Sequence, residues 1–166
     1  MITIEKAGIK DIKMVQDLAR KIWPIAYGKI LSPEQLGFML DKFYSLESLE
    51  HQMVVLNHQF IIAKENSDPV GFASYAAYDN NASVYHLHKL YVATDMQGKN
   101  VGKQLLGHLT FQIKDDGGNS LQLNVNRFNN AVAFYKKQGF TILREDDIDI
   151  GNGYVMNDYV MGKKLK

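Results

Sequence analysis

Two glycines near the middle of the chain stand in a segment whose residue types suit the binding of an anion. Gly98 and Gly102 enclose three residues, and Lys103 follows them. Residues 86–92 before them, His-Leu-His-Lys-Leu-Tyr-Val, have the composition of a strand, and apolar residues at helical spacing come after. A strand, a glycine loop and a helix in this order aim unpaired backbone N–H groups and the positive end of a helix dipole at one point. The segment therefore predicts a site for phosphate oxygens.

This loop differs from two well-known phosphate-binding patterns. A P-loop has four residues between its glycines and then Lys-Ser or Lys-Thr, whereas here the glycines enclose three residues and Gln104 follows Lys103. The dinucleotide pattern G-x-G-x-x-G is also absent from the sequence. On these residues alone, a glycine-bearing connection into an amphipathic helix with no ligand remains the alternative.

The composition limits the class of protein. The 166 residues are 46% hydrophobic and 22% charged, which is typical of one soluble globular domain. A net charge of +1 gives no long-range field for a nucleic acid or an anionic membrane, so neither is expected as a partner. The absence of cysteine excludes disulfides, zinc thiolate sites and a cysteine nucleophile. No leader or membrane-spanning run is recognised, so a cytoplasmic location is expected.

The half of the chain before the loop predicts an opening strand, three helices and an antiparallel meander. Apolar residues at helical spacing from Ile12 to Ile22 predict a first helix that ends at Pro24. Ser32 and Pro33 form a helix start, with a serine to cap and a proline at the first helical position. The remaining expected elements are a helix at residues 46–53 and strands at residues 2–4, 60–64, 70–78 and 83–92.

The half after the loop predicts two helices that alternate with strands. A helix with apolar residues at positions 101, 105, 109 and 113 is followed by a strand at 121–125. Asn129 can cap a second helix, which Gly139 ends in a left-handed conformation. A hairpin then joins residues 140–150 and 154–161 around Gly-Asn-Gly. The order of elements predicts an α/β (α+β) fold.

Two segments of the chain resemble the GNAT-type N-acetyltransferase superfamily. Residues 90–102 resemble its motif A, [Q/R]-x-x-G-x-[G/A], with Asn100 where the family usually has the first glycine. Asparagine tolerates a positive φ better than other non-glycine residues, so the loop is expected to form. Residues 124–140 resemble the family's later segment, which ends in Phe-Tyr-x-x-x-Gly-Phe. The resemblance implies one GNAT-like domain over residues 1–166, with a mixed, mostly antiparallel sheet of about seven strands and about four flanking helices.

The resemblance also implies acetyl-CoA as the donor. Its pyrophosphate would lie over residues 97–103, and its pantetheine arm would pair like an extra strand with residues 90–92, where the Val92 N–H would polarise the thioester carbonyl. Asn129 would reach the pantetheine, although capping alone also explains it. The residues implied in acetyl-CoA binding are Leu90, Tyr91, Val92, Gln97, Gly98, Lys99, Asn100, Val101, Gly102, Lys103, Asn124, Asn129 and Tyr135.

Two catalytic roles follow from the same resemblance. Tyr135 stands at the family's position for the general acid that protonates the departing thiolate; packing beside Phe134 is its alternative. His86 stands where related sequences carry a glutamate that acts as the base, and it could act directly or through water. A histidine satisfied within the sheet is the alternative for His86. His86 and His88 without a third ligand make a weak zinc site, so no metal is expected.

The acceptor site is expected between the first helices and the terminal hairpin. Its candidate residues are Trp23, Tyr27, Met156 and Tyr159, which could instead be core. The resemblance implies transfer of acetyl to a primary amine of a small, polyamine-like molecule or of a protein. A catalytically impaired acyl-CoA-binding module is the alternative, because Asn100 and His86 depart from the family's pattern. Formation of a homodimer stays open.

Overall fold

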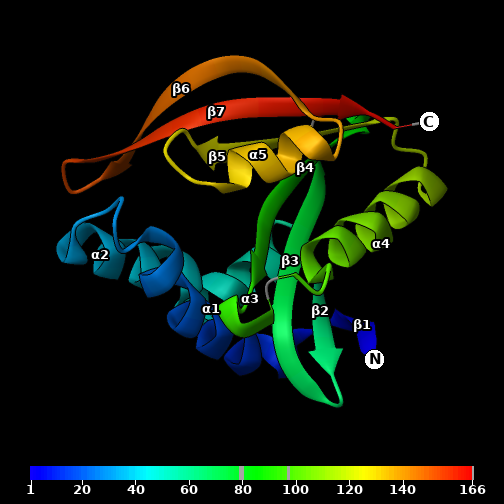
Figure 1. Cartoon of the computed structure of the whole chain (residues 1–166), viewed down its shortest axis with the longest axis horizontal. Helices are drawn as coiled ribbons and strands as arrows, with labels where there is room; N and C mark the ends of the chain where they lie inside the picture. Colours follow the sequence, from blue (N-terminus) through cyan, green and yellow to red (C-terminus); the bar gives the residue numbers. More distant parts are fainter. Residues whose placement is uncertain (79–80, 97, 166) are drawn as a thin grey trace.

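The computed structural model describes residues 1–78, 81–96 and 98–165 as one seven-stranded sheet with helices on both faces (Figure 1). The strand order is β1-β2-β3-β4-β5-β7-β6, and the pair β4–β5 is parallel while the other neighbours are antiparallel. The strands are β1 (Ile2–Ala7), β2 (Gln59–Glu65), β3 (Asp68–Tyr78), β4 (Asn81–Val92), β5 (Ser120–Asn126), β6 (Thr141–Gly151) and β7 (Tyr154–Lys164). The expected mixed, mostly antiparallel sheet is confirmed.

Five α-helices lie within the described residues, the number that the hydrophobic periodicity predicted and close to the four or so that the family resemblance implied. They are α1 (Ile12–Tyr27), α2 (Pro33–Tyr44), α3 (Leu46–Val54), α4 (Val101–Asp115) and α5 (Ala131–Lys137); short 3-10 turns occur at Ile9–Asp11 and Thr94–Met96. The cap expected before α2 is present, because the Ser32 hydroxyl accepts a hydrogen bond from the Gln35 N–H at 3.1 Å. None of these helices is long and apolar enough to cross a membrane.

The first helix does not end at Pro24, as its sequence predicted, but continues to Tyr27. A proline inside a helix removes one backbone hydrogen bond. Trp23 and Tyr27 on the last turn are both buried against the sheet, and burial of an aromatic side chain contributes about 2 to 3 kcal/mol. Tertiary packing therefore offsets the cost of the proline.

Each face of the sheet carries its own hydrophobic core. Helices α4 and α5 cover one face, over a cluster that includes Leu105, Leu109 and Tyr135. Helices α1 to α3 cover the other, over a cluster that includes Trp23 and Phe72. The two helical layers hold the strands from both sides, so the geometry of β4 and β5 between them is fixed by packing.

Candidate active site

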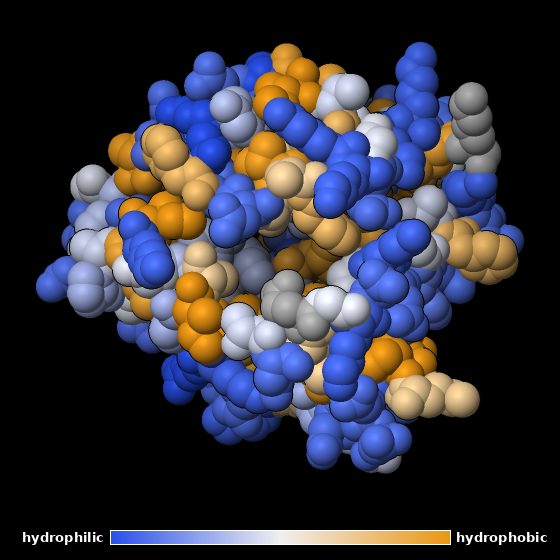
Figure 2. All heavy atoms as spheres, in the orientation of Figure 1, coloured by the Kyte–Doolittle hydropathy of each residue, from blue (hydrophilic) through white to orange (hydrophobic). Residues whose placement is uncertain are grey.

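Strands β4 and β5 separate halfway along their length. They pair in parallel from Val84 with Ser120 to Leu87 with Leu123, and no further pairs follow. In Figure 1 the sheet opens at this point into one half formed by β1–β4 and another formed by β5–β7. Figure 2 shows a hollow at the centre of the same face. Because backbone groups at the separation have no neighbouring strand, they are free to pair with a ligand.

A β-bulge at His88 marks the start of this separation. Ser74 pairs with Lys89 and Tyr75 pairs with Leu87, so His88 is the extra residue on β4. Beyond the bulge the Ala93 N–H donates to the Val70 carbonyl on β3 at 2.8 Å. Since N–H groups alternate along a strand, the N–H of Val92 points away from β3, into the space that β5 has left. This is the direction needed for the role expected of Val92.

The loop before α4 presents backbone N–H groups at the same end of β4. The first N–H groups of a helix have no carbonyl partner within it, and the Asn100 side chain makes no capping hydrogen bond. The N–H groups of Val101, Gly102 and Lys103 are therefore available to an anion at the positive end of the helix dipole. Asn100 has φ 60° and ψ 25°, so the left-handed conformation expected at this position is confirmed.

The other loop residues differ in what they offer a phosphate. Gly98 has φ 84°, a conformation that favours glycine. The Lys99 Nζ lies 3.5 Å from a Glu65 carboxylate oxygen, while Lys103 is exposed. Gln97, implied in the same site by the family motif, lies outside the described residues. The backbone N–H groups and the Lys103 ammonium are thus the main groups that the loop offers to a phosphate.

Tyr135 lies against the separated part of β4. It is 7% exposed and, with Leu90, Tyr91 and Asn124, lines a cavity of about 40 Å³. Its ring packs edge-on against Phe134 and Phe140, with centroids 5.3 Å and 5.6 Å away. Burial raises the pKa of the Tyr135 hydroxyl above its ordinary value, so the group stays protonated at any working pH. Asn129 lies before α5, where its side-chain oxygen accepts from the Ala131 N–H at 2.9 Å.

A second cavity, of about 100 Å³, lies on the α1–α2 side of the separation. It shares Leu87, His88, Tyr91 and Asn124 with the cavity beside Tyr135. Its further lining residues are Tyr27, Leu31, Met39, His86, Asn126, Met156 and Asp158. A shared wall therefore separates the cavity lined by Tyr135 from the cavity lined by the His86 imidazole and the Asp158 carboxylate.

The structure brings two of the four predicted acceptor residues to this second cavity. Tyr27 and Met156 line it, and the Tyr27 hydroxyl lies 3.0 Å from the Tyr91 hydroxyl. Trp23 is buried behind them, with its ring centroid 4.6 Å from that of Tyr27. Tyr159 packs with the cluster under α4 and α5. Trp23 therefore supports the wall of the cavity, and Tyr159 lies on the opposite face of the sheet.

His86 lines the second cavity as a neutral imidazole. Its Nδ1 lies 2.8 Å from the Tyr78 hydroxyl, and burial lowers its pKa to about 4. An unperturbed histidine has a pKa near 6.5, so burial moves the titration of His86 well below neutral pH. His58 and His88 stack next to it, with ring centroids 3.9 Å apart. Within the described residues, these histidines and the other potential ligands form no group of three or more that could hold a metal ion.

The lowered pKa gives His86 a measurable effect on stability. An unfolded histidine binds a proton near pH 6.5, whereas folded His86 does so only near pH 4, so the protein should lose stability as the pH falls through this interval. His86→Gln should make the free energy of unfolding fall less steeply between pH 6.5 and 4.5, as measured by urea denaturation. His108→Gln, on α4 and outside the cavity, provides the control. Equal slopes in the wild type and His86→Gln would contradict the shift.

Asp158 is the residue of this cavity that sequence reasoning missed. It is 1% exposed, its Oδ2 accepts from the Asn124 side chain at 3.3 Å, and its Oδ1 has no hydrogen-bond partner among the described residues. Burial, more than any neighbouring charge, raises its pKa to about 6. An aspartate inside a strand without a matching cation is unusual, and this is the signal that could have identified it.

Comparison with known proteins gives the class of this site. The model of the acetyltransferase (GNAT) domain family matches residues 29–161. A spermidine N(1)-acetyltransferase of Thermoplasma acidophilum is 29% identical over 99% of this chain and 98% of its own. The crystal structure of the PaiA N-acetyltransferase of T. acidophilum in complex with coenzyme A superimposes with a TM-score of 0.83, at 28% identity over 99% of both chains.

A [ribosomal protein bS18]-alanine N-acetyltransferase of Haemophilus influenzae is 33% identical over 54% of this chain and 56% of its own. The protein described here belongs to the GNAT acetyltransferase family. The family assignment made from the two motifs is confirmed, and acetyl-CoA is the acetyl donor.

Proposed function

We propose that the enzyme transfers the acetyl group of acetyl-CoA to a terminal primary amine of a small, polyamine-like molecule. The observation that carries this proposal is the pair of cavities that meet at the separation of β4 and β5. The cavity with Tyr135 would hold the thioester, and the cavity with His86 and Asp158 would hold the amine. Direct transfer needs the two reactants on either side of one opening, and this arrangement supplies it.

On the donor side, the chain binds through its backbone. The first N–H groups of α4 would hold the pyrophosphate, and the edge of β4 from Leu90 to Val92 would pair with the pantetheine arm. The Val92 N–H would donate to the carbonyl oxygen as negative charge develops there, and the Tyr135 hydroxyl would protonate the departing sulfur.

On the acceptor side, the size of the cavity favours a small molecule. A volume of about 100 Å³ admits the end of an aminoalkyl chain, and Leu31, Met39 and Met156 would contact its methylene groups. The similarity to a spermidine N(1)-acetyltransferase over the full chain supports the same substrate class. The acetylation of a protein amine is the second possibility, since relatives act on ribosomal protein bS18 and on peptidyl-lysine. A cytoplasmic location stays a prediction of the sequence.

Thiol release from acetyl-CoA tests the proposal. The protein contains no cysteine, so a thiol reagent reports the product alone. We expect aliphatic diamines and polyamines to give turnover well above that of a peptide ending in alanine or carrying lysine. Turnover with peptides only would move the acceptor to proteins. Stabilisation by acetyl-CoA with no turnover for any amine would support the catalytically impaired module instead.

A further inference from the structure

Two carboxylates are directly opposed on β6 and β7, and one of them, that of Asp158, lines the acceptor cavity. Asp146 on β6 pairs directly with Asp158 on β7, and directly opposed residues of an antiparallel pair project from the same face of the sheet. The next pair, Asp147 with Asn157, projects from the other face. Asp146 is half-buried, and Asp158 lines the cavity. Like charges placed in this way destabilise a sheet unless something compensates them.

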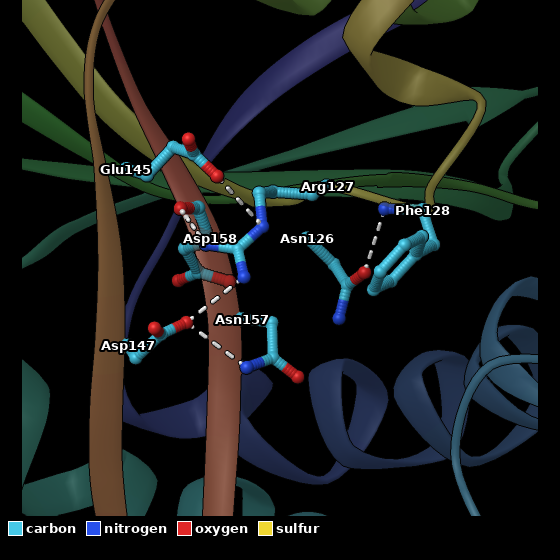
Figure 3. A network of polar contacts seen from close by, with 7 residues as sticks. All are labelled: Asn126, Arg127, Phe128, Glu145, Asp147, Asn157 and Asp158. Carbon is cyan, nitrogen blue, oxygen red and sulfur yellow. Dashed lines mark hydrogen bonds and ion pairs between the residues drawn. The ribbon is translucent and has the colours of Figure 1, made fainter.

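The nearby cationic side chain, that of Arg127, pairs with carboxylates on the other face of the sheet. The Arg127 guanidinium lies 3.0 Å from an Asp147 carboxylate oxygen and 3.3 Å from a Glu145 carboxylate oxygen, and it reaches only the backbone carbonyl of Asp158 (Figure 3). Within the described residues, neither Asp146 nor Asp158 takes part in an ion pair. The cavity face of the β6–β7 pair therefore keeps two negative charges that the protein itself does not neutralise.

The unpartnered Oδ1 of Asp158 shows where a ligand would bind. A buried carboxylate oxygen without a hydrogen bond is costly, and in native proteins such an oxygen has a catalytic role or is met by a ligand, an ion or a water. Asp158 also contacts Asn124, which belongs to the wall between the two cavities. The carboxylate is thus placed next to the position where the thioester would meet the amine.

We propose that Asp158 binds the reacting ammonium group of the acceptor and accepts its proton, and that Asp146 binds a second ammonium group of the same molecule. The inference rests on the proposed function and names the residues that would recognise a diamine. Directly opposed side chains of a strand pair begin about 5 Å apart, a spacing that a short alkyl chain between two nitrogens can bridge.

The ammonium group loses two protons during the transfer, one before and one after the C–N bond forms. An N–H bond of the ammonium breaks and an O–H bond forms on Asp158, which leaves a neutral amine with a free electron pair. This pair forms the C–N bond with the acetyl carbon, the C–S bond breaks with its electrons on sulfur, and the sulfur takes the Tyr135 proton. The second proton that the nitrogen loses returns to Tyr135 through solvent, and Asp158 releases its proton to water. One proton is released in each turnover.

The surroundings of Asp158 suit a carboxylate that accepts a proton and releases it again. Burial and the charges of Asp146 and Asp147 raise its pKa, while the Asn124 hydrogen bond and Arg127 lower it, and the result is about 6. Tyr27, His86 and His88 line the same cavity and are neutral near pH 7. The carboxylate is ionised at neutral pH, yet it is a better proton acceptor than an exposed aspartate.

Kinetics with 1,3-diaminopropane and propylamine test the proposal. Asp158→Asn should lower kcat/KM for both amines by about 100-fold or more, the usual range for a lost proton acceptor. Asp146→Asn should lower kcat/KM about 10-fold for the diamine alone, through KM. Asp149→Asn removes the same charge from an exposed position of the same strand, where asparagine can still accept from the Gly151 N–H, and should change neither value. Wild-type activity after Asp158→Asn, or equal losses for both amines after Asp146→Asn, would overturn the respective half of the proposal.

Stability measurements separate recognition from folding. Without ligand at pH 7.5, Asp158→Asn should melt at the same temperature as the wild type or higher, because it removes a buried charge that has no ion-pair partner among the described residues. Adding 1,3-diaminopropane should raise the melting temperature of the wild type and not that of Asp158→Asn. This binding needs no turnover, so a failure of the proposed transfer reaction would still leave the diamine site tested. No diamine-dependent shift in the wild type would overturn the site.

Discussion

Replacing Tyr135 with phenylalanine should lower kcat by about 100-fold or more and leave the binding of acetyl-CoA almost unchanged. The hydroxyl lines the donor cavity and is the acid proposed for the departing sulfur, and loss of a positioned acid commonly costs this much. The ring is held between Phe134 and Phe140, so phenylalanine can keep the same packing. Steady-state thiol release, with the acceptor saturating, gives the measurement.

The control for this variant is another tyrosine of the same core. Tyr85 packs against the cluster under α4 and α5 but does not line either cavity, so Tyr85→Phe should keep the wild-type rate. Melting temperatures of both variants should lie close to that of the wild type. If Tyr135→Phe turned over at the wild-type rate, the residue would have only the packing role that its position beside Phe134 also allows.

Features that depend on a few neighbouring residues were the ones that the sequence predicted well. The Ser32 cap, the left-handed Asn100 and the positive φ of Gly139 each follow from the chemistry of a single side chain or its absence. The order of strands and helices followed from hydrophobic periodicity and from the two family motifs. Each of these signals is contained in a window of about twenty residues or fewer, which a sequence displays directly.

Features that depend on residues far apart in the chain were not predicted. The helix that continues past Pro24 is stabilised by aromatic packing between α1 and the sheet. Asp158 becomes notable only when β7 lies next to β6 and near the end of α1, because its carboxylate then lines a cavity and stands opposite Asp146. In the sequence it is one of several acidic residues near the terminal hairpin, where a solvated strand face is the ordinary interpretation.

The lowered pKa of His86 has the same origin. In the sequence, nothing beside this strand histidine indicates a pKa other than the ordinary value near 6.5. In the folded protein it lines the second cavity, with its Nδ1 beside the Tyr78 hydroxyl and its ring 4.6 Å from that of His88. Its surroundings therefore favour the neutral imidazole, and the pH dependence near 6 is expected from Asp158. His86→Gln should keep that dependence, whereas Asp158→Asn should lose it.

Substitution of Gly102 should show whether the loop before α4 binds the donor. A Cβ at this position would lie 3.5 Å from the Phe134 ring and 3.7 Å from the Val92 side chain, which is ordinary contact. Alanine is therefore tolerated. The further carbons of leucine must enter the space between these two side chains or cover the N–H groups at the start of α4. Either position would block the approach of the donor to this loop. Gly102→Leu should lose the binding of acetyl-CoA, and Gly102→Ala should keep most of it.

The shift in melting temperature on adding acetyl-CoA measures donor binding in the wild type and in both Gly102 variants. At a donor concentration of about 100 times Kd, binding stabilises the folded protein by about 2.7 kcal/mol. For a domain of this size that corresponds to a shift of about 5 to 10 °C, which the wild type and Gly102→Ala should show and Gly102→Leu should not. Leucine has a higher helix propensity than glycine, so a loss of the shift would not come from a weaker helix. A full shift in Gly102→Leu, or a shift with ATP but not with CoA, would mean that this loop does not bind the donor's phosphates.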